Sequence, residues 1–183
     1  HAQSEASATI DMIRATRTIC SDNSVVLNEQ VFLTGYSQGG HSSMATAKEI
    51  QANYSSEFNV EAVAPGGGTF DLSGIAADSL ASPTRVTGEP QALCLVAWSY
   101  MNAYRDTLIA RGLPYTELDQ VFESPYDSLL AIILHPDSAL YNAGQLLDEI
   151  PSRMLIDTLE NQFRNDRNFW MREFLADNDL YNW

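Results

Sequence analysis

The chain has 183 residues and 20.3 kDa, with 45% hydrophobic and 19% charged residues, a balance that predicts one folded domain or one core with a large insertion rather than a disordered chain. Ten basic residues against 24 acidic ones give a net charge of −14, which would repel a nucleic-acid backbone, so nucleic acid is excluded as an expected partner. No apolar run approaches the roughly 20 residues that a membrane-spanning helix needs.

The first part of the chain alternates helices and strands. Apolar spacing predicts an amphipathic helix over residues 8–20, and a short apolar run at 31–34 predicts a fully buried strand. A helical pattern follows over 39–53, and a second buried strand is predicted at 60–65. The order strand, helix, strand is typical of a parallel sheet, so the predicted fold class is α/β, with residues 1–74 as a partial core.

The second part, residues 75–183, is predicted to be mostly helical. Its composition and periodicity give four helices and no convincing strand. The predicted helices cover residues 89–111, 126–134, 143–150 and 152–176. The apolar face of the first of them is interpreted as a packing face between this segment and the core, with a substrate-lining role as the alternative.

One motif carries chemistry. Residues 35–39 read Gly-Tyr-Ser-Gln-Gly and lie between the first predicted strand and the helix after it, which is the context that a G-x-S-x-G nucleophile elbow requires. Small residues at Gly35 and Gly39 are expected to prevent collisions in a strained turn that exposes the Ser37 hydroxyl. The Gln38 amide, at the positive end of the helix, is the expected oxyanion donor.

The residues around this motif resemble those of a known family. The stretches 31–40 and 62–72, together with Ile13-Arg14-Ala15, are similar to α/β-hydrolases of the secretory lipase type. The resemblance covers residues 10–75 and implies part of an α/β-hydrolase parallel sheet, followed at 75–183 by a helical cap insertion. It also implies Ser37 as nucleophile, the Gln38 amide as an oxyanion donor, and a secreted or periplasmic location.

The partners of the serine are harder to place. A serine nucleophile needs a histidine base oriented by an acid, and in this fold the acid and then the histidine follow the serine. His135 lies in the helical segment and is interpreted as a surface or loop residue, whereas His41, on the elbow helix, is interpreted as a packing or capping residue. Asp71 is a candidate acid, with loop capping as the alternative.

These gaps lead to an expectation about the chain itself. Two strands cannot form the sheet of this fold, so we expect the chain to be an interior portion of a larger enzyme. The triad acid and histidine are then expected outside this chain, on the remainder of the enzyme as a separate chain or on another subunit. Without such a partner, the protein would have to complete itself by oligomerising or would not be an active hydrolase.

Cysteine and metal chemistry are less informative. Cys20 and Cys94 fit one disulfide or two free thiols equally well. No group of carboxylates and histidines has metal-ligand spacing, and the glycines at 66–68 lack the Lys-Ser/Thr of a phosphate loop. The sequence therefore predicts no metal and no cofactor.

The predicted function is that of a serine ester hydrolase, a carboxylesterase or lipase, which acts on a small-molecule or lipid ester through an acyl-enzyme on Ser37. Two alternatives stay open. The same elbow serves peptidases and thioesterases, and a protein that has lost its base would be a non-catalytic interaction domain with the α/β-hydrolase fold.

Overall fold

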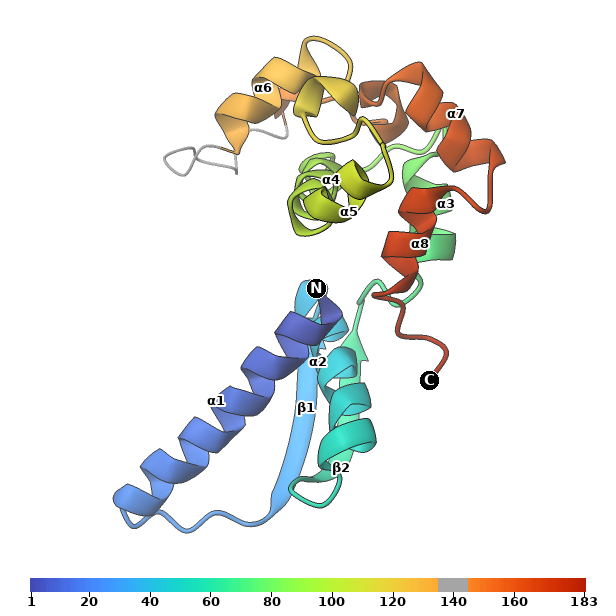
Figure 1. Cartoon of the computed structure of the whole chain (residues 1–183). Helices are drawn as coiled ribbons and strands as arrows, with labels where there is room; N and C mark the ends of the chain where they lie inside the picture. The colour runs from blue at the N-terminus through green and yellow to red at the C-terminus, as the bar shows by residue number, and fades with distance from the viewer. Residues whose placement is uncertain (135–144) are drawn as a thin grey trace. The chain divides into compact units, whose positions relative to one another are not determined.

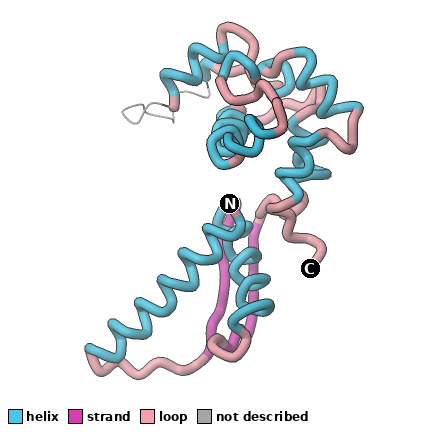
Figure 2. Tube along the Cα trace, viewed as in Figure 1, coloured by secondary structure: helices cyan, strands magenta, loops and turns pink. Residues whose placement is uncertain are grey.

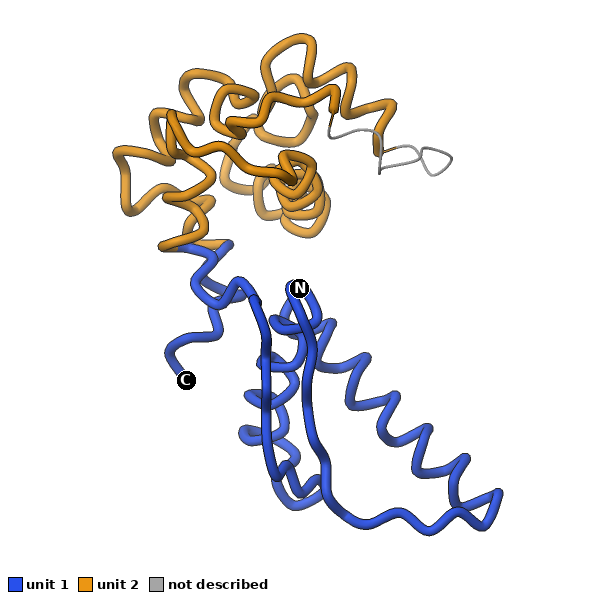
Figure 3. The backbone as a smooth tube through the Cα atoms, turned by 180° about the vertical axis from the view of Figure 1, so that it is seen from behind, with its two compact units in different colours: residues 1–73, 175–183 blue, residues 74–174 orange. Residues whose placement is uncertain are grey.

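The structure is a computed structural model that describes residues 1–134 and 145–183. The chain divides into two compact units, shown in different colours in Figure 3. Unit 1 comprises His1–Ser73 together with Leu175–Trp183, and unit 2 comprises Gly74–Phe174. No helix in the described ranges combines the length and the apolar character needed to cross a membrane.

Unit 1 contains the predicted α/β arrangement (Figure 1). The two strands pair in parallel, with Leu33 opposite Val63 and an irregularity between Val31 and Phe32. The elements of this unit, in chain order, are α1 (Ala2–Asp22), β1 (Gln30–Tyr36), α2 (Gln38–Glu49), a π-helical turn (Ile50–Tyr54) and β2 (Asn59–Gly66). The α/β fold class is confirmed, although α1 begins six residues earlier than predicted.

The core of unit 1 forms where both helices meet the sheet. Ile10 of α1, Leu33 of β1 and Ala47 of α2 are buried together, and Ile50 and Phe58 complete the cluster. Burial of these side chains removes apolar surface from water at about 25 cal/mol per Å². This cluster fixes α2, and therefore the turn that precedes it, against the two strands.

The strand β1 is covered on one face. Leu33 is 7% exposed, whereas Phe32 is 65% and Tyr36 82% exposed. Successive strand residues point to opposite faces, so the helices of unit 1 pack on the Leu33 face and leave the Phe32 face uncovered. The prediction of a fully buried strand is therefore wrong in this structure, because periodicity in a four-residue run does not separate one buried face from two.

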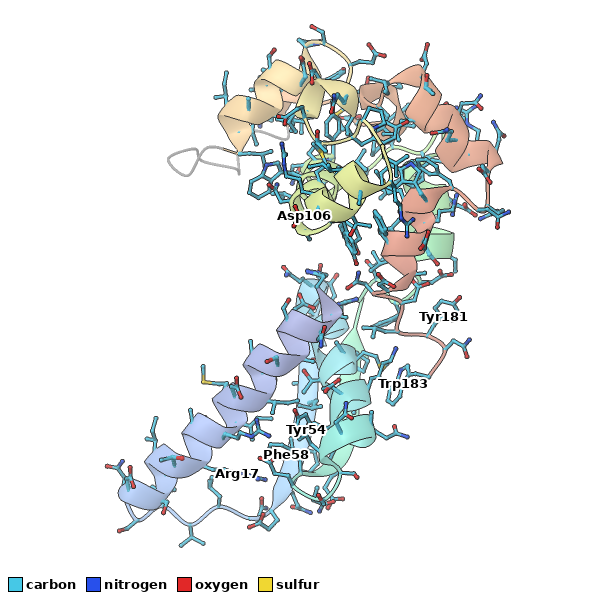
Figure 4. The ribbon with its side chains drawn as sticks, viewed as in Figure 1. Arg17, Tyr54, Phe58, Asp106, Tyr181 and Trp183 are labelled. Carbon is cyan, nitrogen blue, oxygen red and sulfur yellow. The ribbon has the colours of Figure 1, made fainter. Side chains whose placement is uncertain are left out.

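The C-terminal half of α1 makes cation–π contacts. Arg17 lies over the ring of Phe58 at 4.8 Å from its centroid (Figure 4). Arg14 lies over the ring of Tyr54 at 5.0 Å from its centroid. Arg14 also donates two hydrogen bonds to the Glu57 carboxylate, at 2.8 and 2.7 Å. These contacts attach α1 to the loop before β2, at the opposite end of the sheet from the turn at Ser37.

The last nine residues return to unit 1. The Asp179 carboxylate accepts hydrogen bonds from the Leu72 and Ser73 amides, at 2.7 and 3.0 Å, and the Leu180 amide donates to the carbonyl of Phe70. Leu180 is buried with Ala2 of α1 in a second cluster. The predicted helical segment 75–183 therefore loses its last nine residues to unit 1, because side chains of these residues pair with backbone groups far away in the sequence.

Unit 2 is built from helices and loops (Figure 2). Its described helices are α3 (Ala77–Leu80), α4 (Gln91–Ala103), α5 (Arg105–Ala110), α6 (Tyr126–Ile133), α7 (Asp157–Asn165) and α8 (Trp170–Ala176), with 3₁₀ turns at Leu118–Gln120 and Pro151–Met154. The last two residues of α8 belong to unit 1. The helical character is as predicted, and no strand occurs in the part of this unit that the structure describes, apart from one isolated bridge between Phe122 and Leu155.

Three of the predicted helix ranges need correction. The range 89–111 is two helices that meet at Tyr104. The range 152–176 begins within a 3₁₀ turn and is interrupted at 155–156 and again at 166–169. Residues 147–150 are not helical, and 143–144 lie outside the described residues. Apolar periodicity continues across short breaks because both flanking helices use the same buried side, so periodicity alone places these boundaries poorly.

Unit 2 has a core of its own, rich in aromatic side chains. Tyr104 stacks on Phe174 with ring centroids 4.2 Å apart, and the buried guanidinium of Arg172 donates to an Asp78 carboxylate oxygen at 2.6 Å. Its most deeply buried side chains include Leu108, Val121, Phe122, Leu130, Met154 and Leu159. Unit 2 is therefore a folded body and not an extended lid loop.

Candidate functional site

The turn between β1 and α2 is the candidate site. β1 ends at Tyr36, α2 begins at Gln38, and Ser37 between them has φ 55° and ψ −120°. Few residues other than glycine adopt a positive φ, and such a conformation typically costs about 1–3 kcal/mol. Ser37 is exposed. The strand and the helix thus hold an exposed serine in a strained backbone, as the sequence motif predicted.

The strained turn depends on close backbone approach at two glycines. A Cβ added at Gly35 would overlap the Gly39 carbonyl and lie 2.9 Å from the Ser43 hydroxyl oxygen. A Cβ at Gly40 would lie 2.6 Å from the Gly66 carbonyl oxygen, where α2 meets the end of β2. Gly39 differs, since a Cβ there would meet nothing within 4 Å. The predicted need for a small residue is therefore met at Gly35, while at Gly39 the steric reason is wrong.

The first turn of α2 presents backbone N–H groups beside Ser37. The Ser37 amide donates to the Gly66 carbonyl at 2.9 Å, and the amides of Gly40 and His41 donate to the Ser37 carbonyl at 3.0 and 3.1 Å. The Gln38 and Gly39 amides precede Gly40 in the chain, and the first N–H groups of a helix have no carbonyl partner within the helix. The partial positive charge of the helix N-terminus adds to their affinity for a negative oxygen.

The side chains of this turn are tied to α1 and to the C-terminal segment. Gln38 donates from Nε2 to Glu5 Oε1 at 2.9 Å, and His41 Nδ1 lies 2.9 Å from Glu5 Oε2. The other ring nitrogen of His41 lies 3.1 Å from the Asn178 carbonyl oxygen, and the Asn178 side chain accepts from the Ala2 amide at 2.9 Å. His41 is 4% exposed. Its predicted packing role fits this geometry.

The described residues bring together one group of side chains that could ligate a metal. Atoms of His1, Glu5 and His41 lie within 4.8 Å of one another, and the His1 ring stacks on His41 with centroids 5.4 Å apart. Sequence spacing did not show this group, because its members come from two helices. Both His41 nitrogens and both Glu5 oxygens already take part in hydrogen bonds, so the arrangement serves as a contact between α1 and α2.

The candidate triad partners do not join Ser37 in the described structure. Asp71 is half-buried in the segment after β2, which Asp179 holds through the neighbouring Leu72 and Ser73 amides. No hydrogen bond links a histidine to the Ser37 hydroxyl among residues 1–134 and 145–183. His135 lies outside the described residues. The structure thus supplies the turn and the amide donors, and leaves the base unassigned.

Comparison with known proteins shows which family the segment around the turn resembles. Residues 1–89 match the secretory lipase family. The resemblance to α/β-hydrolases of the secretory lipase type is therefore confirmed for the part of the chain that contains Ser37. No curated protein matches the chain.

Solved structures extend the likeness to the whole chain. The rice cell wall degrading esterase LipA from Xanthomonas oryzae superposes with a TM-score of 0.81 at 30% identity, and the match covers 100% of this chain and 47% of LipA. A ligand-bound form of LipA gives the same values. A Legionella pneumophila protein, 22% identical with a TM-score of 0.75, shares the fold over 100% of this chain and 46% of its own. The chain thus spans about half the length of the solved relatives that it matches.

Sequence reasoning missed several residues that support the turn. Glu5 lies 33 residues from Gln38 in sequence, and Asn178 lies 137 residues from His41. No motif or periodicity connects positions so far apart. One signal was available in the sequence: Glu5 lies next to Ala6, and small residues such as alanine allow two helices to pack closely.

Proposed function

We propose that this chain carries the nucleophile of a serine ester hydrolase, a carboxylesterase or lipase that forms an acyl-enzyme on Ser37. The observation that supports the proposal most is the backbone at Ser37, with φ 55° between β1 and α2. Ser24 also has a positive φ, but Ser37 combines it with a position between a strand and a helix N-terminus, and strained residues tend to cluster at active sites. The match to secretory lipases and the likeness to an esterase point to the same chemistry.

The proposed reaction begins with attack of Ser37 Oγ on the ester carbonyl carbon, while a histidine accepts the hydroxyl proton. The carbonyl oxygen becomes negative and accepts a hydrogen bond from the Gln38 amide at the N-terminus of α2. The C–O bond to the alcohol then breaks, the histidine gives its proton to the leaving oxygen, and water later releases the acid from Ser37. Loss of one oxyanion donor typically slows such a reaction by about 100- to 1000-fold.

The base and acid are assigned to residues outside the described ones. His41 is occupied on both ring nitrogens, and His1 contacts Glu5 and the His41 ring. We therefore propose that the histidine and acid of the triad come from the remainder of the enzyme, which would be the partner of this chain. The cap role of unit 2 and the acyl specificity stay predictions, and secretion is proposed from the family name.

The test is hydrolysis of p-nitrophenyl esters by the natural gene product, purified in full. Ser37→Ala is expected to abolish the burst and the steady-state rate. Ser42→Ala, a control serine inside α2 and outside the turn, is expected to leave both unchanged. Activity that survives in Ser37→Ala would contradict the proposal, whereas cleavage of amides or thioesters alone would favour a peptidase or thioesterase.

Acyl chain length then defines the substrate class. A lipase is expected to hydrolyse long-chain esters, with a rate that rises when the substrate forms an interface. Activity confined to short acyl groups would identify a carboxylesterase. An inactive but folded gene product would favour the non-catalytic interaction domain.

A further inference from the structure

One carboxylate contacts two polar side chains in the first turn after the serine. Glu5 projects from α1, and its two oxygens lie 2.9 Å from Gln38 Nε2 and 2.9 Å from His41 Nδ1. The Glu5 side chain is 14% exposed and that of His41 5%. The contact between Glu5 and His41 is therefore largely shielded from water, where such bonds are stronger than at the surface, whereas the bond to Gln38 is exposed.

The two side chains that Glu5 contacts belong to the first turn of α2. Gln38 directly follows Ser37 and supplies the proposed oxyanion amide, and His41 donates its own amide to the Ser37 carbonyl. The main helix-to-helix packing nearby comes from small residues, with Ala6 of α1 and Ala45 of α2 in one buried cluster. The apolar cluster of Ile10, Leu33 and Ala47 holds α2 against the sheet further along the helix, whereas the hydrogen bonds from Glu5 are directional and act on the first turn itself.

The hydrogen-bond pattern of His41 requires a proton between the ring and Glu5. His41 Nε2 faces the Asn178 carbonyl oxygen, which can only accept, so Nε2 carries a hydrogen. Nδ1 faces a carboxylate oxygen, which also accepts unless it is protonated. The contact between Nδ1 and Glu5 therefore contains one shared proton, while the other Glu5 oxygen accepts from Gln38.

We propose that Glu5 is a positioning residue for the oxyanion donor of Ser37. Glu5 acts through Gln38 and His41, which it holds in one orientation so that the Gln38 amide points at the oxygen of the reacting ester. The inference rests on the proposed function and adds Glu5, a residue of α1, to the groups that support catalysis at Ser37. A displacement of about 1 Å in such a site can lower the rate about 100-fold, which is why an anchor next to the turn matters.

The alternative is that Glu5 only attaches α1 to α2. A residue of that kind lowers the unfolding temperature and the fraction of folded enzyme, but each enzyme molecule that remains folded works normally. A positioning residue instead lowers kcat per active site and leaves KM nearly unchanged, because the oxyanion bond forms in the transition state and not in the bound ester. Titration of active sites with a fluorophosphonate separates the two cases.

The experiment compares Glu5→Ala, Glu5→Gln and a control, Glu57→Ala, in the natural gene product. Glu57 also pairs with a cation in unit 1, but at the opposite end of the sheet from Ser37. A glutamine at position 5 keeps every hydrogen bond, since its oxygen accepts from Gln38 and its NH₂ group donates to neutral His41.

The proposal predicts that kcat per titrated site falls about 10- to 100-fold in Glu5→Ala with KM within about 2-fold. Glu5→Gln is expected to stay within about 3-fold of the wild type, and Glu57→Ala to equal it. A Glu5→Ala variant with the kcat of Glu57→Ala, or a Glu5→Gln variant as slow as Glu5→Ala, would overturn the inference.

A double-mutant cycle and a serine variant complete the test. Gln38→Ala removes the side chain and keeps the backbone amide, so its combination with Glu5→Ala is expected to lose less than the product of the two single losses. If the loss of kcat in the double variant equals the product of the two single losses, Glu5 does not act through Gln38. If Ser37→Ala is inactive and Glu5→Ala is normal, only the inference fails; if Ser37→Ala remains active, the proposed function fails and the inference with it.

Discussion

The two units of this chain are stabilised in different ways. In unit 1, close backbone contacts occur at Gly35 and Gly40, on either side of Ser37. The Glu5–His41 pair lies at the same turn. In unit 2, aromatic and apolar side chains make up most of the interior, and the buried Arg172 pairs with the partly exposed Asp78. The difference indicates that the contacts of unit 1 position the turn at Ser37, whereas the contacts of unit 2 stabilise its fold as a whole.

The largest expected effect is a difference in activity between variants at two glycines of the same motif. Gly35→Ala is expected to abolish ester hydrolysis, because its Cβ would overlap the Gly39 carbonyl and force the turn apart. Gly39→Ala is expected to retain activity within about 10-fold, because a Cβ there meets nothing within 4 Å. Steady-state rates of both variants check this prediction. Equal loss in the two would show that the contacts in unit 1 do not explain the turn.

The next effect concerns the interior of unit 2. Phe122 is 1% exposed, so Phe122→Ala is expected to lower the free energy of unfolding of that unit by about 3–5 kcal/mol. Ile109→Ala, at a residue 59% exposed, is expected to cost less than about 1 kcal/mol. Chemical denaturation followed by far-UV circular dichroism measures both. A small effect at Phe122 would contradict a packed interior in unit 2.

A smaller effect depends on pH. Burial tends to raise the pKa of Asp78, but hydrogen bonds from Arg167 and Arg172 outweigh it and lower the pKa below the usual value. A carboxyl group with a lowered folded pKa adds stability above its unfolded pKa of about 4, and that stability is lost as pH falls through the folded pKa. The Asp78 side chain is 43% exposed, so screening by water reduces the contribution to about 1 kcal/mol.

Asp78→Asn tests this directly. The variant is expected to be less stable than the wild type at pH 7 and to approach it as the pH falls below about 4, since the wild type then loses its charged carboxylate. Thermal unfolding from pH 7 to pH 3 measures the difference. A stability gap that stays constant over that range would show that the ion pair does not carry the effect.

The smallest effect distinguishes the two thiols, which are both free. Burial raises the pKa of Cys94 in unit 2 to about 12, whereas Cys20 in unit 1 is partly exposed. Only the thiolate reacts with alkylating agents, so iodoacetamide at pH 8 is expected to modify Cys20 and leave Cys94 unmodified until the protein unfolds. Peptide mass mapping checks the order. Early reaction of Cys94 would indicate that unit 2 opens readily.

Much of the fold was predictable because its signals are local. The strand at 31–34, the turn at 35–39 and the helix after it are specified by short apolar runs and glycine positions, and all of them are present in the structure. The breaks at Tyr104 and at 166–169 were missed, because a change of helix direction leaves the apolar period intact.

The candidate site was predictable only where it is continuous in sequence. Ser37 and Gln38 follow from the motif, and their backbone placement agrees with it. The contacts of Glu5 and Asn178 could not be found, because they depend on how α1 and the last nine residues pack around α2. The open space at Gly39 likewise depends on what surrounds the turn.

The central claim is that Ser37 is the nucleophile, and covalent labelling tests it most directly. The natural gene product is treated with a fluorophosphonate, digested, and mapped by mass spectrometry. We predict one stoichiometric adduct on the peptide that contains Ser37, and none after prior unfolding, because labelling depends on the strained turn. An adduct on a different residue, or a folded protein that hydrolyses esters without any label at Ser37, would contradict the account.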